Sequence, residues 1–154
     1  MPEILFYKTL PLEVEKTFYS LVEKSNEKGL ISVAIFNNEE KLDLINDFLW
    51  TNKQDSFLPH VKRSDEIVTD FSIPLYLTTE EENPYNAEIL FSIDGYIPKK
   101  IDSWERLIFI ADPNDNALLE KYKKFYETIK RDFKKINFYK KTENGKWAED
   151  NFMG

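Results

Sequence analysis

Short apolar runs alternate with longer amphipathic stretches along this sequence, and that alternation restricts the fold more than any other feature. The runs at residues 30–36 (LISVAIF) and 106–111 (RLIFIA) are almost entirely apolar, which is typical of strands buried on both faces of a sheet. Strands that alternate with helices favour a mostly parallel sheet covered on both faces. We therefore predict an α/β fold of three layers, α/β/α, with a mostly parallel, Rossmann-like sheet.

The other expected elements follow the same two periodicities. Further strands are predicted at residues 3–8, 73–78, 87–94 and 136–141, with one more candidate strand at 66–72. Helices are predicted at residues 9–29, 39–50 and 114–133, and either Asn37 or Asn38 can cap the second of these. The first helix should turn Leu12, Phe18, Leu21 and Val22 inward. The last should bury a stripe formed by Leu118, Leu119, Tyr122, Phe125, Tyr126 and Ile129.

Length and composition are those of one small globular domain. The chain has 154 residues, of which 42% are hydrophobic, and no segment reads as a linker, so residues 1–154 are expected to form a single domain. Residues 148–154 are expected to be a flexible tail. The sequence has no cysteine, no apolar run of about 18 residues and no signal-peptide pattern. We expect a cytoplasmic protein without disulfides or a membrane span.

Charge is distributed unevenly along the chain. The net charge is −7, but residues 114–141 contain nine basic and four acidic residues, so this segment is +5 and the remainder is −12. An acidic body is a poor binder of nucleic acid, because phosphates would be repelled. The basic segment instead suggests a small acidic ligand, although a solvated helix face has the same pattern.

Catalytic patterns are scarce in this sequence. The four glycines do not cluster as a phosphate-binding turn requires. His60 is the only histidine, so neither a triad nor a two-histidine metal site can be built within the chain. We predict no catalytic residue, no metal and no cofactor. The alternative is a hydrolase or nucleotide-binding enzyme of the α/β class that uses carboxylates and His60.

The stretch FLWTNKQDSFLPH, residues 48–60, places large apolar side chains on both sides of a polar loop. Trp50 precedes the polar part, and Phe57 and Leu58 follow it. Such side chains either pack the loop onto the core, line a site or dock another protein.

Several stretches in order resemble one family, the chi subunit of bacterial DNA polymerase III. LDLINDFLW followed by DSFLPH is similar to the family's most recognisable block, a helix end of the form L-D-x-x-L-W before S-F-[LV]-P-H. FYK, IPLYLT, NPYNAEILFSIDG and ERLIFIADPND resemble successive sections, and INFYKKTENGKW resembles the closing strand, turn and tryptophan. The likeness runs almost from end to end.

The resemblance implies a non-catalytic adaptor of the DNA polymerase III holoenzyme, an enzyme whose reaction is DNA-directed DNA synthesis. One surface would bind the psi subunit, another clamp-loader component or a helicase. A second surface would bind the acidic, hydrophobic C-terminal tail of single-stranded-DNA-binding protein (SSB). Contact with DNA would then be indirect. A third possibility, direct binding of single strands, requires aromatic side chains interleaved along a positive groove.

The same resemblance assigns residues to the two surfaces. Trp50 and Phe57 would anchor the psi-type partner, with Leu58 beside them. Lys123, Tyr126 and Lys130 would bind the SSB tail, because they fall within about 60° of one another on a helix. Glu127 stands where relatives carry a basic residue. The segment KYKKFY also aligns through Tyr122, and either Lys121 or Lys124 can replace Lys123.

Overall fold

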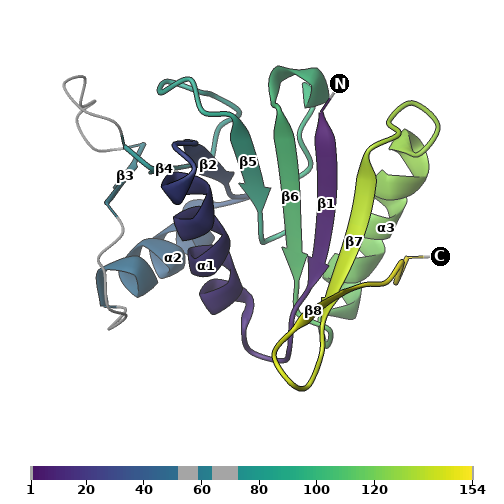
Figure 1. Cartoon of the computed structure of the whole chain (residues 1–154). Helices are drawn as coiled ribbons and strands as arrows, with labels where there is room; N and C mark the ends of the chain where they lie inside the picture. The colour runs from purple at the N-terminus through teal and green to yellow at the C-terminus, as the bar shows by residue number, and fades with distance from the viewer. Residues whose placement is uncertain (1, 52–58, 64–72, 154) are drawn as a thin grey trace.

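A computed structural model describes residues 2–51, 59–63 and 73–153 of the chain. Its centre is an eight-stranded sheet with the strand order β3-β4-β2-β5-β6-β1-β7-β8 (Figure 1). All neighbouring strands run parallel except β7 and β8, which are antiparallel. In chain order the elements are β1 (Glu3–Lys8), α1 (Val14–Glu27), β2 (Ser32–Ile35), α2 (Glu39–Thr51), β3 (His60–Lys62), β4 (Leu75–Thr78), β5 (Ile89–Ser92), the short 3-10 helix η1 (Ile101–Ser103), β6 (Arg106–Ala111), α3 (Asn116–Ile129), β7 (Ile136–Lys141) and β8 (Trp147–Glu149).

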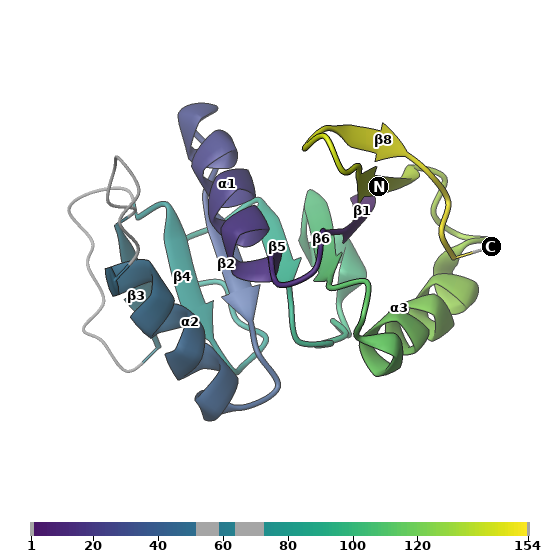
Figure 2. The ribbon, with the colours of Figure 1, turned by 90° about the horizontal axis from the view of Figure 1, so that it is seen from below.

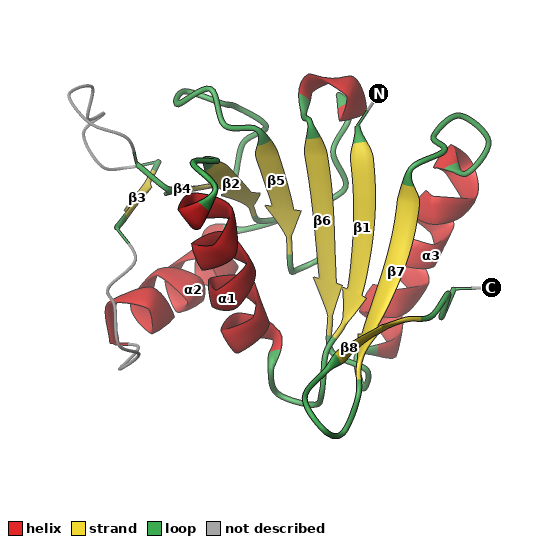
Figure 3. Cartoon of the chain, viewed as in Figure 1, coloured by secondary structure: helices red, strands yellow, loops and turns green. Residues whose placement is uncertain are grey.

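The sheet separates two hydrophobic cores, as the alternation of strand side chains requires. In β1, Leu5 faces α1 and α2, whereas Ile4 and Phe6 face α3. Figure 2 shows α1 and α2 on one face of the sheet and α3 on the other, and Figure 3 shows the same layers by element type. The predicted three-layer α/β/α class with a mostly parallel sheet is therefore confirmed.

Local sequence explains where the first two helices begin. Asn38 is the cap of α2, because its side-chain oxygen accepts a hydrogen bond from the Lys41 N–H at 2.9 Å. Helix α1 begins only at Val14, and Leu12 lies before it with a positive φ of 64°. The prediction that Leu12 packs inward is therefore wrong: its side chain is 92% exposed.

Two short edge strands are absent from the sequence prediction. β3 and β8 have three residues each, which is too few for a periodicity to show. The candidate strand at 66–72 lies outside the described residues.

The structure describes the segment that we expected to be a flexible tail, 148–154, as far as residue 153. β8 pairs with β7, and Met153 is only 4% exposed within the core beneath α3. In the structure, residues 148–151 are exposed, and the segment is anchored by the pairing of β8 and by Met153. Among the described helices, none is long and apolar enough to cross a membrane.

Candidate functional site

A groove of about 550 Å³ opens beside the last turn of α3, and we call it the α3 groove. Its walls come from α3, the loop between α3 and β7, β7 itself, and the end of β8 with the segment that follows it. The lining residues are Tyr126, Lys130, Phe133, Lys134, Ile136, Asn137, Phe138, Glu149, Asp150 and Asn151. The groove therefore combines an aromatic and aliphatic lining with two lysines and two carboxylates.

Tyr126 supplies the aromatic ring that α3 contributes to the groove. The ring is half-buried and lies edge-on to Phe138, with 5.0 Å between ring centroids. Tyr122, one turn earlier, is only 1% exposed, and its hydroxyl donates a hydrogen bond to the Ser92 carbonyl at 3.0 Å. Burial raises the pKa of Tyr122 far above its ordinary value. Of the two tyrosines that the sequence could align, only Tyr126 reaches this surface.

Lys130 stands at the end of α3 and is exposed. Its ammonium is 2.6 Å from the Glu127 carboxylate and 5.9 Å from the centre of the Tyr126 ring. The hydrogen bond to Glu127 raises the pKa of Lys130. Glu127 is thus an acidic neighbour that any incoming anion would have to displace.

The other candidate lysines lie differently. Lys123 is exposed on α3 but is not among the described lining residues of the groove. Lys124 is exposed as well, and Lys121 lines a separate cavity near the start of the helix. The structure therefore brings together Tyr126 and Lys130 from the predicted set, and leaves Lys123 outside the groove.

Trp50 projects from the last turn of α2, at the opposite edge of the sheet. Its side chain is 62% exposed, and its ring centroid lies 5.3 Å from that of His60. Trp50 is therefore largely exposed, although one side of its ring packs against the buried His60. The other two predicted contacts of this surface, Phe57 and Leu58, lie outside the described residues.

His60 is placed on β3 and is only 8% exposed. Its Nε2 atom lies 3.1 Å from the Asn46 side-chain oxygen. Among the described residues, the His60 side chain is thus packed and lies within hydrogen-bonding distance of Asn46, as is usual for a buried polar group.

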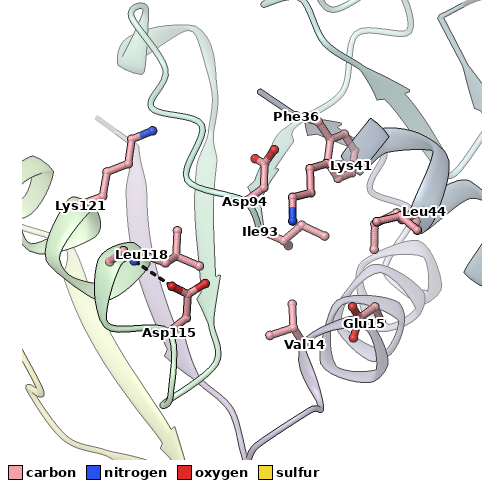
Figure 4. A pocket seen from close by; sticks show the side chains of 12 residues that line it. Val14, Glu15, Phe36, Lys41, Leu44, Ile93, Asp94, Asp115, Leu118 and Lys121 are labelled. Atoms are coloured by element: carbon pink, nitrogen blue, oxygen red, sulfur yellow. Dashed lines mark hydrogen bonds between the residues drawn. The ribbon is translucent and has the colours of Figure 1, made fainter. Parts of the chain in front are cut away.

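A second cavity, about 340 Å³, lies at the carboxyl ends of β2 and β5 (Figure 4). After β2 the chain continues toward the β3 edge of the sheet, whereas after β5 it continues toward β6 in the opposite direction. Open α/β sheets bind ligands where the direction of the connections reverses in this way, and the cavity lies at that point. Figure 4 shows Lys41 and Lys121 on opposite sides of the cavity, with Asp94 and Ile93 between them. We call this cavity the central crevice.

The helices that begin at the central crevice are already capped. Asp115 accepts a hydrogen bond from the Leu118 N–H at 3.1 Å, and Asn38 caps α2. A phosphate at either helix start would have to displace these acceptors. Burial raises the pKa of Asp94, although the N–H of Asn37 and the Lys121 ammonium oppose the rise.

The enzyme alternative needs carboxylates and His60 at one place. The described residues that line the central crevice include Glu15, Asp94 and Asp115 but not His60, which lies at the β3 edge. Among the described residues, no group of three or more side chains of His, Asp or Glu is placed to hold a metal ion. Among the residues that the structure describes, His60 and the carboxylates of the central crevice are therefore not brought together.

Sequence reasoning missed the half of the α3 groove that does not come from α3. Ile136 and Phe138 lie on one face of β7, and their alternation with polar neighbours was a usable signal for that face. Glu149, Asp150 and Asn151 join them only because β8 folds back along β7. The local sequence does not predict that these three residues line the groove.

Comparison with known proteins gives two findings. A family model described as "DNA polymerase III chi subunit, HolC" matches residues 1–135. The chain is also 28% identical over 134 residues to a protein of Rickettsia prowazekii (strain Madrid E) named "Probable DNA polymerase III subunit chi". That alignment covers 81% of this chain and 80% of the relative.

Proposed function

The chain belongs to the DNA polymerase III chi subunit family, and we propose that it serves the polymerase as a cytoplasmic, non-catalytic adaptor. In this proposal one surface binds the acidic C-terminal tail of SSB, and another binds the psi subunit or an equivalent clamp-loader component. The adaptor would then connect the clamp loader to SSB-coated single strands without gripping DNA itself. The observation that carries the proposal is the α3 groove, whose lining combines aromatic and aliphatic side chains with two lysines and two carboxylates.

The chemistry of the α3 groove suits a short acidic peptide that ends in an aromatic residue. The peptide's ring would lie against Tyr126 and Phe138, where aromatic pairs prefer edge-on or offset contact. Its carboxylates would pair with the Lys130 and Lys134 ammonium groups. We propose that Lys123, outside the groove, adds only longer-range attraction, which salt screens over about 10 Å at 0.1 M.

A fluorescence-anisotropy titration tests this half of the proposal. The probe is a labelled peptide that copies the last nine residues of SSB from the same organism. We expect micromolar binding that weakens as salt rises, about tenfold weaker binding by Tyr126→Ala and about threefold by Lys130→Ala. Lys123→Ala should have a smaller effect. Lys28→Ala is the matched control, since it removes an exposed lysine at the end of α1, on the opposite face of the sheet.

Absence of binding at about 100 μM protein would remove the SSB-tail role. Equal losses in Lys130→Ala and Lys28→Ala would show that only the overall charge matters. The α3 groove would then not be the site.

The Trp50 surface is our proposed docking site for the psi-type partner. A tryptophan with 62% of its side chain exposed has a large apolar area to bury and few rotamers to lose. Phe57 and Leu58 are proposed to complete the contact. A helicase that uses the same surface is the competing partner.

Co-purification of the clamp loader with wild-type and Trp50→Ala protein tests this surface. We expect Trp50→Ala to lose the clamp-loader complex while it retains both its melting temperature and its affinity for the SSB-tail peptide. Retention of the complex would reject the Trp50 surface as the docking site.

A further inference from the structure

The last residue of β8 and the segment that follows it make acidic and aromatic contacts at the edge of the α3 groove. We call residues 149–153 (Glu149, Asp150, Asn151, Phe152, Met153) the acidic strap. In Figure 1 the chain runs from β8 across β7 toward α3. The first three strap residues line the groove directly.

The strap holds its acid against a lysine and its ring against an aromatic side chain. The Asp150 carboxylate lies 3.6 Å from the Lys140 ammonium. The Phe152 ring packs edge-on against Phe138, with 5.6 Å between centroids, and the Lys8 ammonium lies 5.1 Å from the same ring. The strap thus pairs a carboxylate with a lysine and places a phenyl ring between an aromatic side chain and an ammonium group. An acidic peptide that ends in an aromatic residue would make the same kinds of contact.

Phe138 is the residue that the strap and a bound peptide would share. The Tyr126 and Phe152 rings both pack edge-on against the Phe138 ring. The distances between ring centroids are 5.0 Å for Tyr126 and 5.6 Å for Phe152. The strap is also joined to β7 at this residue, since the Asp150 N–H donates to the Phe138 carbonyl at 3.1 Å. Phe152 therefore covers a part of the Phe138 ring that a bound peptide would otherwise contact.

Charge points in the same direction. The charged side chains among the described lining residues are Lys130, Lys134, Glu149 and Asp150, so the groove is neutral while the strap is in place. With the two strap carboxylates moved away, the same lining would carry two positive charges. An acidic ligand is attracted only to the second state.

We propose that the acidic strap is a cis-acting competitor for the α3 groove, which an acidic peptide with a terminal aromatic residue displaces when it binds. This inference rests on the proposed peptide-binding function of the groove and adds its regulation. Binding then requires the strap to open, and with it the pair of Glu149 and Tyr139 at the end of β8, while the other strands stay paired. The intrinsic affinity of the groove is reduced by the fraction of time that the strap occupies it.

Two measurements on the full chain test the inference. The first is the titration with the SSB-tail peptide, applied to Asp150→Asn and Phe152→Ala. We expect each to bind about threefold more tightly than wild type, and the double variant more tightly still, because each removes one contact of the competitor. Glu143→Gln is the matched control, since it removes an exposed carboxylate in the β7–β8 turn, away from the described groove lining.

The direction of the Phe152→Ala effect separates the two roles that this ring can have. A competitor predicts tighter binding, whereas a ring that forms part of the peptide's binding wall predicts weaker binding. If wild type binds the peptide and both variants bind it equally or more weakly, the strap does not compete for the groove. The proposed peptide-binding function is unaffected by that result. No binding by any variant overturns both.

The second measurement is amide hydrogen exchange at Asp150. In the free protein we expect its N–H to exchange at least about 100-fold faster than the buried amides of β1, because the strap opens locally. A saturating amount of peptide should increase exchange at Asp150 further. Exchange of Asp150 at the rate of β1, with no change on addition of peptide, would show that the segment is a fixed part of the domain and would overturn the inference.

Discussion

Replacing Tyr122 with phenylalanine should lower stability and leave peptide binding intact, whereas changes at Tyr126 should do the reverse. Tyr122 is 1% exposed, and its hydroxyl lies 3.0 Å from the Ser92 carbonyl and 3.3 Å from the Ile110 carbonyl. Tyr122→Phe removes the donor and leaves buried carbonyl groups with one partner fewer. The expected cost is about 1–2 kcal/mol. For a chain of this size that corresponds to a fall in melting temperature of roughly 3–6 °C.

Denaturant titrations give the free energy of unfolding, and the anisotropy assay gives the affinity for the SSB-tail peptide. Tyr126→Phe is the matched control for stability, and we expect it to change the unfolding free energy by less than about 0.5 kcal/mol. We expect Tyr122→Phe to keep the wild-type affinity within about twofold, against about a tenfold loss in Tyr126→Ala. The reasoning fails if Tyr122→Phe melts like wild type, or if it weakens binding as much as Tyr126→Ala does.

Three further changes test other parts of the structure. Glu127→Gln should tighten binding of the SSB-tail peptide about twofold to threefold, because it frees the Lys130 ammonium; unchanged affinity by anisotropy would contradict this. Gly95→Ala should cost about 1–3 kcal/mol, since φ is +93° and a Cβ would lie 3.1 Å from a side chain of α3; thermal melting should show a smaller loss for Gly145→Ala, which has a similar φ but open space. Burial alone would raise the pKa of Glu81, but three donated hydrogen bonds outweigh it and lower that pKa. Glu81→Gln should therefore reduce stability at pH 7, and the difference from wild type in urea should shrink as pH falls below the ordinary value of 4.5.

The long apolar runs predicted their strands because burial on both faces leaves a continuous signal. The run at 106–111 matches β6 at both ends, and the run at 30–36 contains β2, which is buried throughout. Helix periodicity places Leu12 on the inner face only if the helix continues back through Pro11. In the structure Leu12 has a positive φ, and α1 begins after it, at Val14. The short strands β3 and β8 depend on pairing with β4 and β7, and that tertiary contact has no local signature.

The candidate site was predictable only where one helix carries it. A 100° step per residue places Tyr126 beside Lys130, and the structure keeps them together in the groove. The same arithmetic includes Lys123 but contains no information on where the opposite wall lies. That wall comes from β7 and the acidic strap, whose position follows from the strand order. Charge in the strap was visible in the sequence, but its effect on the groove was not.

The two proposed surfaces lie at opposite edges of one sheet, and this arrangement determines how an adaptor can work. Trp50 contacts His60 of β3, and Tyr126 contacts Phe138 of β7, with five strands between β3 and β7 in the sheet. At the usual spacing of about 4.8 Å per strand, the two strands are roughly 29 Å apart. The two surfaces also belong to helices that cover opposite faces of the sheet, α2 and α3, and the packed sheet between them offers no second arrangement through which binding at one edge could bias the other. We therefore expect the affinity for the SSB-tail peptide to stay within about twofold when the Trp50 surface is saturated with clamp loader. A larger change would mean that an element common to both surfaces moves.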